Sequence, residues 1–372
     1  PTSRSLPIDN TTMKIIAATF LYSLVEPCMV SAWTTAAPPT LGTRRYQGRR
    51  SSVLPVSTVQ DDAAALMADD DENENDTKPI PSTKSPKEED AHKRIYSMPA
   101  LYDIAFGYRD YEEEVEFLLQ KHKEIAQYPA RRILDIAAGP ARHAITALQH
   151  EEKPFSVTCI DLSPEMAQYA QELAIDEIQD DEQRANFQYL VNDIRTFELD
   201  TEVTEKEFDS AWILLGSLQH LTKNEEVVQC LSRIHEYLKP GGTVIIELPH
   251  PRETFDMIDC TRNGWNVPLE DEEESDSGEL QIIWGEDGDE FDPITQVRQL
   301  TIEMKLTNMP ETEEMQSVRG IVPTRLFTAQ ELNAMAALAG FRIPAMFGAL
   351  EEGVSVDDED AAFRMVCVLQ KD

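Results

Sequence analysis

One stretch, Arg132 to Met166, constrains the fold more than any other part of the chain. It reads RILDIAAGPARHAITALQHEEKPFSVTCIDLSPEM. Ile133 to Ile136 and Phe155 to Ile160 are short apolar runs, as expected of strands buried on both faces. Between them the chain turns at Gly139-Pro140-Ala141, and a helix pattern runs from Arg142 to about His150. This order predicts the strand–loop–helix–strand unit of a doubly wound α/β sheet.

Two features of the stretch indicate a nucleotide-type ligand. Gly139 lets the backbone approach a ligand closely at a helix N-terminus. Asp161 ends the second strand, 22 residues after Gly139, and the spacing expected for an acid that accepts both hydroxyls of a ribose is about 20. The glycine pattern alone is weak, because Ala137 and Ala141 stand where glycines are often found. An ordinary strand, turn and helix without a ligand is the alternative.

At these residues a family resemblance appears. ILDIAAGPARHA resembles the first motif of class I S-adenosylmethionine-dependent methyltransferases, and Asp161 resembles their ribose acid. Downstream, Asn192-Asp193 resembles the pair beside the adenine, FDSAWILLGSLQHL the fourth strand and its loop, and LKPGGTVIIEL the hairpin into the fifth strand. The resemblance runs from about Tyr102 to the C-terminus. YDIAFGYRDYEEE and RLFTAQELNAMAALAGF are similar to small-molecule enzymes such as sugar-amine N-methyltransferases.

The resemblance implies an α/β fold: a doubly wound, seven-stranded, Rossmann-like methyltransferase sheet with an antiparallel β insertion after strand five. The domain is expected over residues 95–372, with the insertion at residues 251–325 acting as a lid or a dimer surface that selects the substrate. Three segments of the insertion read as strands: Gln281 to Trp284, Gln296 to Leu306 and Glu314 to Val322. A closing antiparallel strand pair is expected at Phe341 to Phe347 and Phe363 to Leu369.

The implied cofactor is S-adenosyl-L-methionine. Backbone groups near Ala137 and Gly139 are expected to meet its methionine end, and Asp193 to accept from its adenine amine. Tyr102 and Tyr111 lie on an apolar stripe at helical spacing and are expected to face the site, although a helix that merely faces the core has the same pattern. The residues expected to bind the cofactor are Asp135, Ala137, Gly139, Arg142, Asp161, Leu162, Met166, Asn192, Asp193, Ile194, Leu215, Tyr102 and Tyr111.

The predicted reaction is methyl transfer to a small-molecule amine or hydroxyl acceptor by in-line SN2 attack. A sulfonium methyl is already activated, so catalysis needs a nucleophile held about 3–3.5 Å away and aligned. An amine must arrive neutral and a hydroxyl must lose its proton, so a base helps. His220 and His250 are the candidate bases, since they follow strands four and five, but loop histidines are often only solvated or structural. Glu247 either orients an amine or caps a strand exit.

Two other functions remain open. A NAD-type Rossmann oxidoreductase would share the glycine loop and Asp161, but it would not predict the Asn192-Asp193 pair, the LKPGG hairpin or a terminal antiparallel strand. A non-catalytic partner protein with a methyltransferase fold would tend to lose the site residues, whereas Asp135, Gly139 and Asp161 are present. N-, O- and S-methylation are all compatible with the sequence.

Charge and cysteine usage restrict the partners. The net charge is −36, which disfavours a nucleic-acid backbone, because phosphates need Lys and Arg; tRNA or rRNA could still use a local basic groove. Stable association with an anionic membrane is equally disfavoured, and a small acceptor, neutral or cationic, fits best. The five cysteines are scattered, which predicts no disulfide framework and no metal site. A homodimer through the insertion is also compatible.

The N-terminal residues read as targeting sequence. Residues 1–32 contain Met13-Lys14, an apolar core from Ile15 to Val25 and small residues suited to cleavage, typical of a signal peptide. Residues 33–60 are basic, rich in hydroxyl side chains and free of acids, like a transit peptide. Together they predict a bipartite plastid address; secretion and a cytoplasmic location are alternatives, and residues 1–12 precede the first methionine. Residues 61–94 are acidic and predict a disordered linker.

Overall fold

The computed structural model describes residues 95–150, 154–199, 208–254, 263–269, 278–307 and 317–372. The signal, transit and linker predictions for residues 1–94 therefore lie outside the described residues. None of the helices in the described part of the chain is both long enough and apolar enough to cross a membrane.

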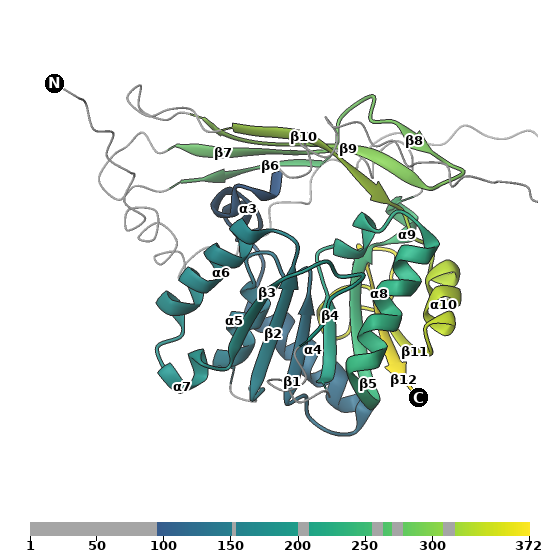
Figure 1. The fold of residues 1–372 in the computed structure, drawn as a ribbon. Helices are drawn as coiled ribbons and strands as arrows, with labels where there is room; N and C mark the ends of the chain where they lie inside the picture. The colour runs from purple at the N-terminus through teal and green to yellow at the C-terminus, as the bar shows by residue number, and fades with distance from the viewer. Residues whose placement is uncertain (1–94, 151–153, 200–207, 255–262, 270–277, 308–316) are drawn as a thin grey trace, which may run out of the picture. The chain divides into compact units, whose positions relative to one another are not determined.

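A seven-stranded sheet forms the centre of the fold (Figure 1), in the order β11-β12-β5-β4-β1-β2-β3. The strands β1 to β5 run parallel, whereas β12 pairs antiparallel with both β5 and β11. The predicted seven-stranded sheet with a terminal antiparallel pair is thus confirmed. The bounds are β1 Arg132–Ile136, β2 Ser156–Asp161, β3 Phe187–Val191, β4 Phe208–Ile213, β5 Leu238–Pro249, β11 Phe341–Phe347 and β12 Arg364–Lys371.

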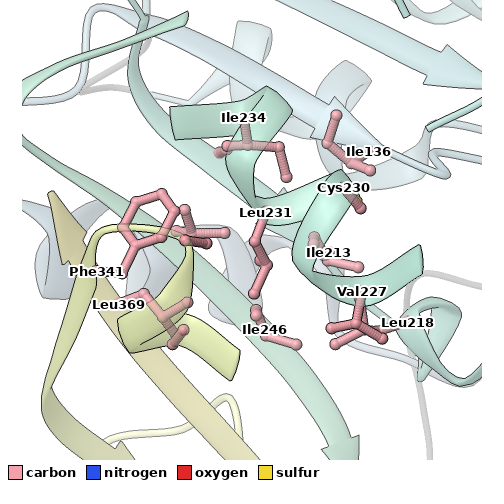
Figure 2. Packing of buried hydrophobic residues seen from close by; sticks show 14 of the residues in the cluster. Ile136, Ile213, Leu218, Val227, Cys230, Leu231, Ile234, Ile246, Phe341 and Leu369 are labelled. Carbon is pink, nitrogen blue, oxygen red and sulfur yellow. The ribbon is translucent and has the colours of Figure 1, made fainter. Parts of the chain in front are cut away.

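Apolar side chains alternate between the two faces of this sheet and bury it on both. Trp212 and Ile245 pack with the helices α4, α5 and α6 on one face. Their neighbours Ile213 and Ile246 pack on the other face with α8 and α10, as Figure 2 shows around Leu231. The central strands are covered on both sides, so their sequences read as continuous apolar runs. The helices are α4 Tyr111–Ala126, α5 Arg142–Gln149, α6 Pro164–Glu177, α7 Asp181–Arg184, α8 Asn224–Tyr237 and α10 Ala329–Leu338.

The segment after β5 forms a second sheet, as predicted. Its strands are antiparallel in the order β10-β9-β7-β6, and β8 pairs with β9. The strands β7, β9 and β10 overlap the three expected segments, whereas β6 and β8 were not expected from the sequence. A short helix α9, Pro251–Thr254, precedes the sheet. The bounds are β6 Asn263–Pro268, β7 Glu279–Trp284, β8 Phe291–Asp292, β9 Val297–Thr307 and β10 Ser317–Arg325.

The apolar stripe at the start of the domain is divided between two helices. The helix α3, Pro99–Phe106, ends at Gly107, and α4 begins after Asp110, whose side chain accepts a hydrogen bond from the Glu113 amide. The core-facing side chains of α3, Leu101 and Ala105, pack with the second sheet, whereas α4 packs against the first. The helix α3 therefore joins the insertion to the central sheet.

Candidate functional site

A cavity opens at the carboxyl ends of β1 and β4. It contains about 460 Å³ of empty space, part of which is open solvent. Its floor consists of the loop after β1 and the loop after β4, and α3 covers one side. The lining residues are Tyr102, Asp103, Phe106, Tyr111, Asp135, Ala137, Ala138, Gly139, Pro140, Arg142, His143, Leu214, Leu215 and Ser217.

The loop after β1 has three residues with the left-handed backbone that favours glycine, although only one of the three is a glycine. Ala137, Gly139 and Ala141 have φ angles of 56°, 53° and 59°, a region that only glycine enters without cost. A Cβ added at Gly139 would meet no atom within 4 Å, so open space adjoins the backbone there. The methyl group of Ala141 packs in the apolar cluster with α4 and α6. The missing third glycine therefore does not narrow the cavity.

Asp135 places a buried carboxyl group in the cavity. Its side chain is 4% exposed, and among the described residues no donor lies within hydrogen-bond distance of it. Burial, and then the negative charge of Asp161, raises the pKa of Asp135 to about 8. A buried polar group without a partner is costly. Its presence in a cavity therefore points to a ligand that is a cation and a hydrogen-bond donor.

Asp161 fixes the backbone on either side of the expected ribose position. One oxygen accepts from the Gly139 amide at 2.9 Å and the other from the Ser163 amide at 2.9 Å. Burial raises the pKa of Asp161, and these backbone hydrogen bonds oppose the rise. Tyr189 donates from its hydroxyl to the Gly139 carbonyl at 2.6 Å. The loop is thus held from two sides before any ligand is present.

The cavity wall formed by α3 is tied to α5 by charge. Asp103 is buried, and both of its oxygens accept from the Arg142 guanidinium, with Nε to Oδ1 at 2.7 Å. Tyr169 donates to the same carboxylate at 2.7 Å, and Arg142 also pairs with Glu177. Arg142 therefore lines the cavity, as expected, but its guanidinium is committed to Asp103. Sequence reasoning missed Asp103, although it lies in the same motif as Tyr102.

A buried charge network supports the loop after β4. Glu247 accepts from Arg109 at 3.1 Å, from Arg364 at 3.0 Å and from the Leu215 amide at 2.8 Å. Burial opposes ionisation of Glu247, but the two guanidinium groups outweigh it and lower its pKa. Leu215 is held with φ at 52°. Of the two roles considered for Glu247, the structure gives the structural one, since it caps the strand exit and fixes the cavity floor.

The network continues to a histidine in the cavity wall. Glu114 accepts from Arg109 at 3.0 Å and lies 2.7 Å from Nε2 of His143, which lines the cavity. Tyr111 packs edge-on against His143, with ring centroids 5.0 Å apart. Sequence reasoning missed His143, and only its place one residue after Arg142 could have suggested it.

The two histidines expected to act as bases lie outside the residues that line the cavity. Nε2 of His220 is 3.1 Å from the Tyr96 hydroxyl. Nδ1 of His250 accepts from the Arg252 amide at 3.1 Å, so its Nε2 donates to the Val356 carbonyl at 3.0 Å. His250 has both ring nitrogens engaged and is buried. In this geometry neither ring nitrogen of His250 is available to take a proton, and the expectation that it acts as a base stays a prediction.

The expected adenine side is only partly assembled around the cavity. Asp193 binds the Arg195 guanidinium through both oxygens, which lowers its pKa, so accepting from an adenine amine would require this pair to rearrange. Asn192 accepts from the Asp193 amide. Leu162 is exposed and Met166 is buried. The expected cofactor residues that do not line the cavity are Asp161, Leu162, Met166, Asn192, Asp193 and Ile194.

Comparison with known families agrees with this geometry. Residues 133–242 match the family model described as a methyltransferase domain. The match includes the loop after β1, Asp161 and the hairpin into β5. The predicted resemblance to methyltransferases is thereby confirmed.

Two bacterial relatives carry the name of a methyltransferase. A protein of Geobacillus sp. (strain WCH70) is 28% identical over 157 residues, which is 42% of this chain and 58% of the relative. YqeM of Bacillus subtilis (strain 168) is 26% identical over 151 residues, which is 40% of this chain and 53% of the relative. The chain thus spans little more than half the length of the relatives it matches.

Solved structures share the fold over most of the described chain. An S-adenosylmethionine-dependent methyltransferase from Clostridium acetobutylicum gives a TM-score of 0.55 at 14% identity, covering 74% of this chain and 98% of that one. The sugar N-methyltransferase KedS8 from Streptoalloteichus sp. gives 0.54 at 17%, covering 73% and 92%. CalS10, an amino pentose methyltransferase from Micromonospora echinaspora, gives 0.52 at 16%, covering 73% and 97%. At these identities the likeness establishes the fold.

Proposed function

We propose that this chain, whose residues 133–242 form a methyltransferase domain, transfers a methyl group from S-adenosyl-L-methionine to a small-molecule amine or hydroxyl acceptor. The observation that carries the proposal is the buried, unpartnered carboxyl group of Asp135 in the cavity. S-adenosylmethionine offers an ammonium and a sulfonium to such a group. A dinucleotide would instead bring a diphosphate to the N-terminus of α5, and a carboxylate at Asp135 would repel it.

The described residues fit the cofactor part by part. Asp135 is the partner for the ammonium, and the open backbone at Gly139 leaves room for the methionine moiety. Asp161 uses one lone pair of each oxygen on the loop amides, so an ionised carboxylate keeps further lone pairs for the ribose hydroxyls. When bound, the cofactor would supply an electrophilic methyl group, which the acceptor's lone pair would attack in line with the breaking C–S bond, so that the sulfur leaves as a neutral thioether.

The chain's own contribution to the reaction is positioning and proton removal. Leu215, fixed by Glu247, and Tyr102 on α3 shape the part of the cavity in which an acceptor can lie. His143 is the lining histidine, and Glu114 orients its ring. We therefore assign His143, rather than His250, the role of accepting a proton from the acceptor. His220, whose Nε2 lies beside the Tyr96 hydroxyl, remains the second candidate base.

The remaining parts of the proposal concern assembly and location. The second sheet packs on α3, which forms one wall of the cavity, so it lies where a lid would lie. The same sheet also offers a surface for a homodimer, and light scattering of the purified chain tests whether the dimer forms. The plastid location rests on residues 1–60 alone. Imaging of a fluorescent fusion with and without these residues tests it, and a signal that stays in the cytoplasm with them contradicts it.

The direct test is calorimetric titration of the full chain with S-adenosylmethionine, S-adenosylhomocysteine and NADH. We expect micromolar binding of the first two and no heat from the third. Gly139→Leu, which fills the open space beside the loop, and Asp161→Ala should each weaken binding at least tenfold. Glu303→Gln, which alters a surface pair with Arg319 on the second sheet, is the matched control. Binding of NADH alone, or unchanged affinity in both site variants, would refute the proposal.

A further inference from the structure

Four aromatic rings gather where the insertion meets the cavity. They are Phe106 at the end of α3, Tyr108 in the following turn, Trp265 on β6 and Trp284 at the end of β7, here called the aromatic wall. The ring centroids of Phe106 lie 5.4 Å from Trp284 and 5.8 Å from Trp265. Trp265 lies 6.3 Å from both Tyr108 and Trp284. Segments about 160 residues apart in the chain thus form one aromatic surface.

The wall is fixed in place and borders the cavity. The indole N–H of Trp265 donates to the Ala105 carbonyl at 2.9 Å, which ties β6 to α3. Phe106 is itself a lining residue of the cavity, and Tyr108 is 64% exposed. Two pairs of rings stand nearly perpendicular, Phe106 to Trp284 at 89° and Tyr108 to Trp265 at 83°. In such an edge-to-face pair the edge of one ring contacts one face of the other.

The ring faces of the wall have no cation from the described residues. Cations lie over other rings of the described chain, such as Arg131 over Phe155 and Arg233 over Tyr237, but over none of the four in the wall. The nearest basic side chain in sequence, Arg109, is committed to Glu114 and Glu247. A ring face attracts cations through its quadrupole. The ring faces that no neighbouring ring covers therefore keep this attraction for a ligand.

We propose that the aromatic wall is the acceptor subsite and that the acceptor is an amine that binds there as its alkylammonium cation and loses a proton before its lone pair attacks the methyl group. That the bound cation is the methyl acceptor rests on the proposed function, whereas the binding of the cation to the aromatic wall is independent of it. The net charge of −36 raises the local concentration of cations near the chain. The wall borders the cavity through Phe106, so a cation on it lies next to the proposed cofactor position. Alkyl groups on the nitrogen add apolar contact with the rings, so more highly alkylated ammonium ions bind more tightly.

The first experiment compares two ligands of the same shape. The full chain is titrated with choline and with 3,3-dimethylbutan-1-ol, in which a carbon replaces the charged nitrogen, with binding followed by ligand-observed NMR. We expect choline to bind at least tenfold more tightly, and tetramethylammonium to bind more tightly than methylammonium. Equal affinity for the two isosteres would show an apolar site and overturn the inference, as would failure of choline to bind at all.

The second experiment changes the rings without unfolding the chain. Biosynthetic replacement of tryptophan by 5-fluorotryptophan weakens the ring quadrupole at constant shape, and we expect it to weaken choline binding about two- to fivefold. Tyr108→Leu on the exposed ring should weaken binding similarly, and Tyr108→Phe should restore it. Phe155→Leu removes an exposed aromatic ring that precedes β2 and is the control. Unchanged choline affinity in both altered proteins overturns the inference.

Titration with S-adenosylmethionine separates this inference from the proposed function. If the cofactor binds and choline does not, the acceptor assignment fails and the methyltransferase assignment stands. If choline binds with the expected selectivity and the cofactor does not bind, the aromatic wall is a cation site and the proposed function fails. Tyr108→Leu should leave cofactor affinity unchanged, because its exposed ring is not a lining residue of the cavity.

Discussion

Replacement of Asp135 by asparagine should raise the free energy of unfolding of the ligand-free chain and weaken its binding of the cofactor. Burial and the facing charge of Asp161 raise the pKa of Asp135 from 3.8 to about 8. A raised pKa in a carboxyl group costs stability wherever the unfolded chain ionises it and the folded chain does not. The cost is absent below about pH 3.8, grows as the pH rises, and is complete above about pH 8. Asparagine carries no such charge at any of these pH values.

The magnitude follows from the distance between the two pKa values. Each pKa unit corresponds to about 1.4 kcal/mol, and pH 7 lies about three units above the unfolded value. The expected gain for Asp135→Asn at pH 7 is therefore on the order of 2–4 kcal/mol. The gain should increase by about 1.4 kcal/mol per pH unit between pH 5.5 and 7.5 and level off above about pH 8.

Urea unfolding at pH 5.5, 6.5, 7.5 and 8.5 measures this difference. Asp289→Asn is the control, since its pKa is lowered: burial opposes ionisation, but hydrogen bonds from Thr301 outweigh it. Asp289 therefore stabilises the chain above its ordinary pKa, and its replacement should destabilise by the same amount at all four pH values. A difference for Asp135→Asn that does not change with pH, or a less stable variant, would refute the reasoning.

The same carboxyl group predicts how cofactor binding depends on pH. A cation favours the ionised form of Asp135, so S-adenosylmethionine should bind more tightly as the pH rises from 6.5 to about 8 and should release a proton on binding. Calorimetry in buffers of different ionisation enthalpy detects that proton. Asp135→Asn should weaken binding at least tenfold and abolish the pH dependence; a pH dependence that persists in the variant would assign it to another group.

Three further changes test the supports of the site. Ala137→Gly relieves a left-handed backbone and should stabilise the chain by about 0.5–1 kcal/mol in urea unfolding; a destabilised variant contradicts the loop geometry. Arg109→Leu leaves Glu247 with one guanidinium partner and should cost about 3–5 kcal/mol, and adding Glu247→Gln should recover part of it; purely additive losses would argue against the pair. Tyr189→Phe removes the hydrogen bond to the Gly139 carbonyl and should cost about 1 kcal/mol and weaken cofactor binding; equal affinity in calorimetry would show that the loop is held without it.

Local patterns in the sequence were sufficient for the fold. The apolar runs of β1, β2 and β4 and the capped start of α6 follow from side chains close in sequence, as does the Thr328 cap of α10. The strand β6 escaped prediction because its sequence, NGWNVP, contains Gly, two Asn and Pro, which strands usually exclude. It is an edge strand, where such residues are tolerated.

The charge network around the cavity could not be predicted in the same way. Glu247 joins Arg109, which precedes it by 138 residues, and Arg364, which follows it by 117. No periodicity connects such positions, and only the fold brings them together. Asp135, Gly139 and Asp161 could be predicted because they lie in one short stretch of the sequence with a recognisable spacing. Asp103 and His143 were passed over because a partner far along the chain gives each of them its role.

The insertion leaves and rejoins the domain close to the loop after β4. Before it, the Glu247 carbonyl accepts from the Gly216 amide at 3.1 Å. At its end, the Arg325 carbonyl accepts from the Gln219 side chain at 3.0 Å. The segment between them adds its sheet without interrupting the seven central strands. In a chain organised in this way, the module that we propose to face the acceptor can be exchanged while the cofactor half stays the same, so we expect that grafting residues 251–325 from a relative alters the specificity.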